Sequence, residues 1–146
     1  DPGRWSPETE ILLFTAARRD HLERRIAPAL ADGATVLCDR FVDSTRVYQG
    51  AARAELRGTV DALHALMIGI EPDRTLILDL DPRTAVARGA ARGGGEDRFE
   101  RFGPAFQTRL RAGFLALAAE FPDRCRVVAA DGPAEAVAAR IAEALA

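Results

Sequence analysis

The sequence predicts an α/β protein built on a parallel β-sheet, and three observations support this prediction. Short apolar runs with β-branched residues recur at 34–38, 75–78 and 126–130. Segments of a dozen or more residues with apolar side chains at helical spacing separate these runs. Parallel strands need crossover connections of that length, and such connections are right-handed. At 146 residues the chain is long enough for one core, and we expect a single domain over 1–146.

The N-terminal part is predicted to be helical. Ser6 and Pro7 are typical of a helix start, because serine caps the first turn and proline fits its first position. Apolar residues then recur at helical spacing until Asp32-Gly33, a pair that commonly ends a helix. The run 34–38 that follows is short, apolar and partly β-branched, so it predicts a buried strand.

The middle of the chain continues the alternation. A helix is expected over about 55–68, where apolar residues share one face. The second predicted strand, 75–78, ends in acidic residues. Asp81 can cap a helix that begins at Pro82, since aspartate accepts the exposed amide hydrogens of a first turn.

The C-terminal part repeats the pattern once more. Three consecutive glycines at 93–95 predict a flexible segment. A helix is expected from about Gly103, followed by the strand 126–130 and a last helix that begins at Pro133. This order of elements predicts that helices cover both faces of the sheet.

Composition excludes several classes of protein. Hydrophobic residues make up 48% and charged residues 29% of the chain, which is typical of a globular protein rather than a disordered one. The net charge of −2 argues against binding to nucleic acid or to an anionic membrane. All 20 basic residues are arginine, so no Walker A phosphate loop, which needs a lysine, lies within this sequence. Cys38 and Cys125 lie in apolar runs and are expected to be buried, reduced thiols.

The residues after each predicted strand are the first candidates for a site, because ligands gather at the carboxyl ends of parallel strands. Asp39 and Arg40 directly follow the run 34–38. An arginine there suits a phosphate, whose oxygens it can bind with two parallel hydrogen bonds, and an aspartate suits Mg²⁺ held through water. The two opposite charges could equally pair with each other or with neighbours.

Four segments of the sequence, one of which contains Asp39 and Arg40, favour a phosphate site over a simple ion pair. The segment 39–50 resembles the thymidylate kinase signature, in which Asp-Arg-aromatic is followed by a serine-containing turn and Tyr-Gln-Gly. Phe14 and Arg18 resemble the family's Phe-x-x-x-Arg helix motif, and the spacing places both on one helix face. The segments 75–82 and 96–100 resemble the family's Leu-Asp-x-Asp-Pro strand end and its Asp-Arg-containing lid.

This resemblance implies the fold of P-loop nucleoside-monophosphate kinases, a three-layer parallel sheet in the strand order 2-3-1-4-5. The first two strands, including the central P-loop strand, are then expected to be missing from this sequence. We therefore expect that 34–38 does not pair with 75–78, and that the isolated chain has little kinase activity.

The resemblance also implies a site for dTMP. Phe14 would stack on the thymine, Arg18 would donate to its 4-carbonyl, Arg40 would hold the phosphate, and Tyr48 would lie against the deoxyribose. The other members of the set would line the base and sugar. The implied substrate-binding residues are Phe14, Arg18, Arg40, Ser44, Thr45, Tyr48 and Gln49.

The implied cofactors are ATP and Mg²⁺. A lid over approximately 88–100 would close on the ATP phosphates through Arg88, Arg92 and Arg98, and the region after Ala130 would border the adenine. Asp39 would help to place Mg²⁺, through water. Catalysis would rest on positioning and charge neutralisation. The residues implied to carry it are Arg40, Asp39, Arg92 and Arg98.

The expected protein is a cytoplasmic homodimer that phosphorylates dTMP to dTDP and binds neither nucleic acid nor a membrane. Two alternatives remain open: a deoxynucleoside kinase, which acts on an uncharged acceptor, and a non-catalytic nucleotide-binding remnant. His21 and His64 are expected to be structural, and Arg111 is expected to lie at the surface.

Overall fold

The computed structural model describes residues 5–92 and 103–146, and the chain forms two compact units, Asp1–Glu71 and Pro72–Ala146. The expected single domain over 1–146 stays a prediction. None of the helices in the described ranges is both long and apolar enough to cross a bilayer.

The first unit begins with a long helical stretch. Helix α1 (Pro7–His21) continues into a π-helical segment (Leu22–Ile26) and then into α2 (Ala27–Ala31). The predicted helix start is confirmed, since the Ser6 hydroxyl accepts a hydrogen bond from the Thr9 amide at 3.1 Å.

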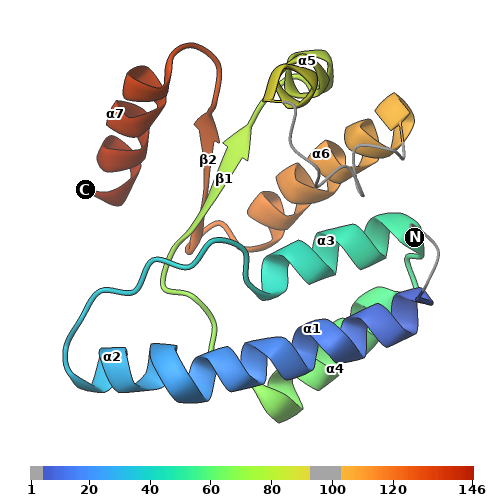
Figure 1. Ribbon diagram of the computed structural model, residues 1–146, viewed down its shortest axis with the longest axis vertical. Coiled ribbons are helices and arrows are strands. Elements are labelled where there is room, and N and C mark those ends of the chain that lie inside the picture. Colours follow the sequence, from blue (N-terminus) through green and yellow to red (C-terminus); the bar gives the residue numbers. More distant parts are fainter. Residues whose placement is uncertain (1–4, 93–102) are drawn as a thin grey trace. The chain divides into compact units, whose positions relative to one another are not determined.

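The strand predicted over 34–38 is wrong. This segment is irregular and links α2 to α3 (Val42–Ala52), as the trace between these helices in Figure 1 shows. Leu37 is 87% exposed. A strand is stable only beside a neighbour that takes its backbone hydrogen bonds, and in the described part of the chain the sheet holds β1 and β2 alone.

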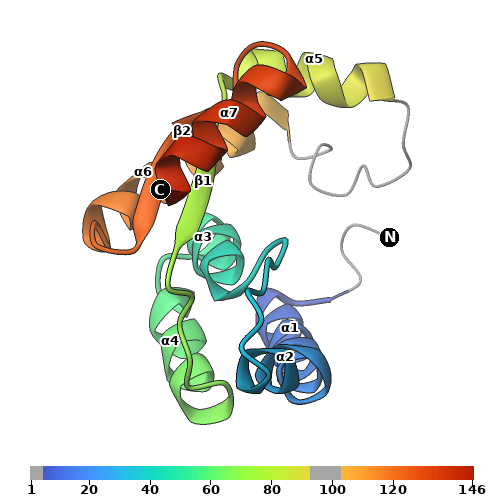
Figure 2. The same cartoon turned by 90° about the vertical axis from the view of Figure 1, so that its left-hand side faces the viewer.

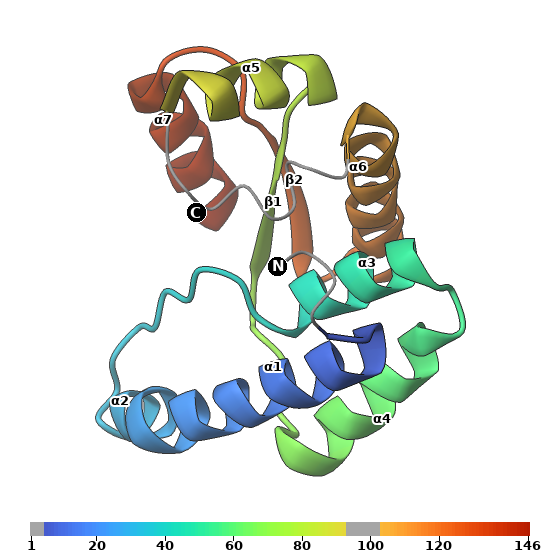
Figure 3. The ribbon, with the colours of Figure 1, turned by 45° about the vertical axis from the view of Figure 1, so that its right-hand side comes forward.

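Helices α1, α3 and α4 (Leu56–Met67) pack together and enclose the core of the first unit (Figure 3). Helix α4 confirms a prediction, whereas α3 is not among the predicted elements. Its apolar period is obscured because four polar or charged side chains of α3 are buried. Of these, Asp43, Arg46 and Gln49 have hydrogen-bond partners within the unit. The buried apolar residues of this core are Ile11, Val42, Leu56 and Val60.

The second unit is built on a parallel pair of strands, β1 (Thr75–Asp79) and β2 (Cys125–Ala129), with Thr75 opposite Cys125. Helices α6 (Gly103–Glu120) and α7 (Ala134–Leu145) lie on opposite faces of this pair (Figure 1), and in Figure 2 α7 lies in front of the strands. This layered arrangement agrees with the predicted α/β class.

Helix α5 (Pro82–Arg92) follows β1, and its predicted cap is confirmed. The Asp81 carboxylate accepts a hydrogen bond from the Arg83 amide at 2.9 Å. The cysteine prediction is half wrong: Cys125 is buried in β2, but Cys38 is exposed because its segment forms no strand.

Candidate functional site

The first candidate feature lies on α1, where Phe14 and Arg18 share one face. The Arg18 guanidinium carbon lies 5.6 Å from the centroid of the Phe14 ring. Phe14 is 38% exposed, so part of its ring is open to a ligand. Burial lowers the pKa of Arg18, while electrostatic interactions with Cys38 and Asp43 favour its charged form. Arg18 therefore lies within electrostatic reach of both the 34–41 segment and the first turn of α3.

The second feature is the backbone at Arg40, the residue predicted to hold a phosphate. Arg40 adopts a left-handed conformation with φ of 63°. Such a conformation costs a residue other than glycine about 1–2 kcal/mol, and strain of this kind is concentrated at functional sites. The Arg40 side chain is exposed, and its guanidinium carbon lies 5.3 Å from the centroid of the Tyr48 ring. Arg40 is thus held at the start of α3 with its charge accessible.

The remaining predicted contacts of the nucleotide lie on α3. Ser44 and Tyr48 are half-buried, whereas Thr45 and Gln49 are buried. The Gln49 amide donates a hydrogen bond to Glu10 Oε2 on α1 at 3.1 Å. The structure therefore brings the predicted residues into two contacting pairs, Phe14 with Arg18 and Arg40 with Tyr48, within one unit. Their roles toward a nucleotide stay predictions.

Sequence reasoning missed a buried ion network centred on Arg46. Its guanidinium binds Asp43 at 2.9 Å, Asp61 at 2.7 Å and Glu71 at 2.6 Å. Burial opposes the charge of Arg46, yet hydrogen bonds with Glu71, Asp61 and Asp43 raise its pKa above the ordinary value. An arginine three residues after an aspartate in a helix could have signalled the pair, but only if α3 had been predicted.

His64, on α4, lies against this network, with Nε2 3.2 Å from Glu71 Oε1. The side chain is 7% exposed. Burial lowers the pKa of His64 below its ordinary value of 6.5, although the nearby Glu71 carboxylate opposes the shift. The expectation that His64 is structural agrees with this position in the core.

A pH dependence of stability follows from His64. Its folded pKa lies below the unfolded value of 6.5, so below that pH the unfolded chain binds more protons than the folded chain. Well above pH 6.5 His64 is neutral in both states and does not affect stability, and the free energy of unfolding should fall as the pH drops below 6.5. Urea unfolding at several pH values measures this slope. His64→Gln should flatten it, and an unchanged slope in that variant would assign it to other groups.

In the second unit the residue at the end of β1 has an unexpected partner. Arg111 of α6 binds Asp79 through two hydrogen bonds, Nε to Oδ1 at 2.6 Å and Nη2 to Oδ2 at 2.8 Å. Hydrogen bonding from Arg111 lowers the pKa of the Asp79 carboxyl. The Arg111 side chain is 40% exposed and so lies at the surface as expected, and its pair with Asp79 also ties α6 to the carboxyl end of the strand.

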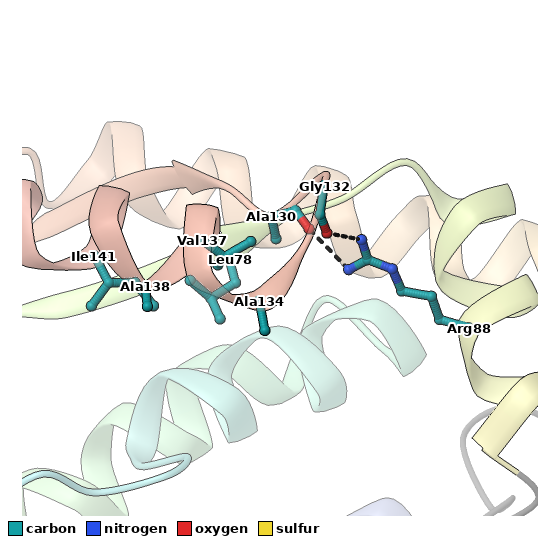
Figure 4. A pocket seen from close by; sticks show the side chains of 8 residues that line it. All are labelled: Leu78, Arg88, Ala130, Gly132, Ala134, Val137, Ala138 and Ile141. Atoms are coloured by element: carbon teal, nitrogen blue, oxygen red, sulfur yellow. Dashed lines mark hydrogen bonds between the residues drawn. The ribbon is translucent and has the colours of Figure 1, made fainter.

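Arg88, predicted as a lid residue, holds the turn after β2. Its guanidinium donates to the carbonyl oxygens of Ala130 and Gly132, both at 2.9 Å (Figure 4). Arg88 lies at the edge of an open, largely apolar hollow of about 520 Å³, which the figure shows along α7. The apolar side chains lining it are Leu78, Ala134, Val137, Ala138 and Ile141. The Arg92 side chain and Arg98 lie outside the described residues, as does most of the predicted lid.

The fit of a magnesium ion can be judged at Asp39. Within residues 5–92 and 103–146, no group of three potential ligand side chains is arranged to hold a metal. Mg²⁺ does not need such a group, because it keeps several waters and commonly binds one or two carboxylates together with substrate phosphates. The exposed Asp39 carboxylate beside Arg40 fits that manner of binding.

Comparison with known proteins gives a consistent result. The family model described as thymidylate kinase matches residues 2–141. A thymidylate kinase of Jannaschia sp. is 67% identical over 94% of this chain and 66% of its own length. That of Dinoroseobacter shibae is 64% identical over 97% of this chain and 68% of its own. The chain thus spans about two thirds of the length of these relatives.

A solved structure extends the comparison to the fold. The crystal structure of thymidylate kinase from Ehrlichia chaffeensis matches with a TM-score of 0.73 and 30% sequence identity. The match covers 98% of this chain and 66% of that one. The predicted fold class is confirmed by this likeness.

Proposed function

Because this chain belongs to the thymidylate kinase family, we propose that it provides the dTMP site and the base of the lid for phosphoryl transfer from ATP to dTMP. The observation that carries the proposal is Arg40, an exposed guanidinium on a left-handed backbone, beside the Tyr48 ring. A cation held in this way at the start of a helix can bind the phosphate of a nucleotide whose sugar lies against Tyr48.

Phe14 and Arg18 support the base end of the proposed site. A partly exposed phenyl ring can stack on a pyrimidine, and the adjacent guanidinium can donate to a pyrimidine carbonyl. Ser44, Thr45 and Gln49 complete the proposed contacts with the base and sugar. Gln49 would act partly through its bond to Glu10, which joins α3 to α1.

The proposed chemistry needs little from general acid or base catalysis, because the acceptor is already a phosphate oxygen. Arg40 holds that acceptor in line with the donor, and the lid arginines Arg92 and Arg98 neutralise charge on the transferring group. Asp39 would hold Mg²⁺ through water, and the bound ion supplies neutralisation of the ATP phosphates.

The proposed binding surface for ATP, the phosphoryl donor, lies in the second unit. The apolar hollow beside Arg88 offers a surface for a flat heterocycle, and the turn that Arg88 holds forms its rim. We assign this hollow to the adenine of ATP and Arg88 to the lid. Arg88→Ala should release the carbonyls of Ala130 and Gly132, and weaker ATP binding, measured by calorimetry, would follow.

The 146 residues contain no lysine, so the chain on its own should bind dTMP without transferring phosphate at a rate typical of kinases. Isothermal titration calorimetry with dTMP and a coupled ADP-release assay on the same preparation test both halves of this statement. Turnover near the ordinary kinase range of about 1–100 s⁻¹ would contradict the second half.

Competition between dTMP and thymidine separates the proposal from its nearest alternative. A monophosphate kinase site should prefer dTMP, since Arg40 contributes only when the phosphate is present. A deoxynucleoside kinase site should bind thymidine at least as well. Binding of dTMP without any turnover in a reaction supplemented with the remaining third of a relative would favour the non-catalytic remnant.

We also propose a cytoplasmic homodimer, as the family resemblance implies. Exposed leucines on α1, Leu12 at 58% and Leu13 at 50%, are consistent with a surface that another copy covers. Sedimentation velocity at several concentrations measures the oligomeric state directly.

A further inference from the structure

We propose that Arg46 is a positioning residue for the nucleotide site: its buried contacts fix the orientation of α3 and thereby set how closely Tyr48 approaches the sugar. The inference rests on the proposed function, because it requires a nucleotide whose sugar lies against Tyr48. Arg46 itself would not touch the nucleotide.

The Arg46 guanidinium contacts residues on more than one element of the first unit. Arg46 leaves α3 and binds Asp61 of α4 through Nε at 2.7 Å. Its two terminal nitrogens bind Glu71, which follows α4, at 3.0 and 2.6 Å. Nη1 also binds Asp43, one turn earlier on α3, at 2.9 Å. A single side chain therefore joins α3 to α4 and to the segment beyond it.

Arg46 is held by several acceptors at once. The Arg46 side chain is 5% exposed and that of Asp43 is 6% exposed, so water screens their interaction weakly. Asp61 is held from its other oxygen by Arg57 at 2.7 Å. A planar guanidinium with several fixed acceptors allows little rotation of the helix that carries it.

Arg46 and Tyr48 project from opposite faces of α3. A helix turns about 100° per residue, so Tyr48, two residues after Arg46, projects about 200° away, from the opposite face. Ser44, two residues before Arg46, lies on that face as well. Tyr48 there contacts the guanidinium of Arg40 at 5.3 Å. The Arg46 network thus holds one face of α3, and the proposed contacts with the sugar and phosphate lie on the opposite face.

A purely stabilising role predicts a different result from a positioning role. Loss of stability lowers the fraction of folded chain, and this affects all nucleotides equally. A rotated α3 instead changes the distance between Tyr48 and the sugar, and so changes the preference between deoxyribose and ribose. The ratio of affinities for dTMP and its 2′-hydroxyl analogue, 5-methyluridine monophosphate, is therefore the informative measurement.

The experiment uses the 146-residue chain and two conservative variants, Arg46→Lys and Glu71→Gln. Lysine keeps the charge but cannot bind several carboxylates in one plane, and Glu71 is 41% exposed, so its variant should fold. In an active site, a displacement of about 1 Å can lower the reaction rate by on the order of 100-fold, which shows how strongly a site depends on such a distance. We expect the preference for dTMP, measured by calorimetry, to fall by about tenfold in both variants.

Arg24→Gln is the matched control, because it removes an exposed ion pair in the same unit, between Arg24 of the π-helical segment and Asp20 of α1. It should keep the preference of the unaltered chain. If both test variants are folded by circular dichroism and retain the full preference, the positioning role is overturned while the proposed function stands. If the unaltered chain binds no dTMP, the proposed function fails and the inference fails with it.

Discussion

Arg40→Ala should reduce the affinity for dTMP by about 100-fold while reducing that for thymidine far less. The guanidinium would make charge-assisted hydrogen bonds to the phosphate, each worth about 1.5–3 kcal/mol, and two of them at the lower end of this range account for a loss of about 100-fold. Thymidine lacks the phosphate, so its affinity should fall only through the loss of the contact between Arg40 and the Tyr48 ring, against which its sugar would lie. Calorimetric titration of both ligands into the variant measures the two effects side by side.

Two controls separate the charge of Arg40 from its backbone. Arg40→Lys keeps the cation but not the planar pair of donors, and should recover part of the dTMP affinity. Arg40→Gly relaxes the left-handed conformation, since glycine adopts positive φ without a steric penalty, and should stabilise the segment while still losing the phosphate contact. Equal losses for dTMP and thymidine in Arg40→Ala would remove Arg40 from the phosphate site.

The second unit was largely predictable from the sequence, and the reason is physical. Its two strands have the apolar composition that predicts a strand, and each finds its pairing partner in the other. Proline and an aspartate cap define the start of α5, and these signals act within a few residues. Local rules therefore sufficed wherever the partner of a segment was also present.

The first unit shows where such rules end. The run 34–38 has the composition of a buried strand, but composition cannot supply the neighbour on which a strand depends. Helix α3 is the opposite case, a helix that its composition does not predict. Its apolar period is interrupted by four buried polar residues, Asp43, Thr45, Arg46 and Gln49. Arg46 and Gln49 can be buried because carboxylates distant in sequence, Glu71 and Glu10, accept their hydrogen bonds in the folded unit.

The family motif identified the candidate residues on α3 but not the way in which they are held. Arg46 lies between two predicted contact residues and was passed over, because a motif marks the residues that face a ligand. Two of the partners of Arg46, Asp61 and Glu71, lie 15 and 25 residues further along the chain, a separation that no local pattern reveals.

Arg46→Met should lower the free energy of unfolding of the first unit by about 3–5 kcal/mol, the cost of removing one partner of a buried ion network. Asp61 and Glu71 are 39% and 41% exposed and can regain water once the guanidinium is gone. Asp43 cannot, because its side chain is 6% exposed, so most of the cost should arise there. Urea unfolding followed by the fluorescence of Trp5, the single tryptophan, reports on this unit.

The double variant Asp43→Asn with Arg46→Met tests that assignment. Replacing the stranded carboxylate with a neutral amide should restore part of the loss, because a buried amide costs less than a buried charge. Arg24→Met, which removes a pair whose members are 75% and 62% exposed, should change stability by less than about 0.5 kcal/mol. If the double variant is no more stable than Arg46→Met, the cost lies in the lost bridge between α3 and α4 rather than in the buried charge of Asp43.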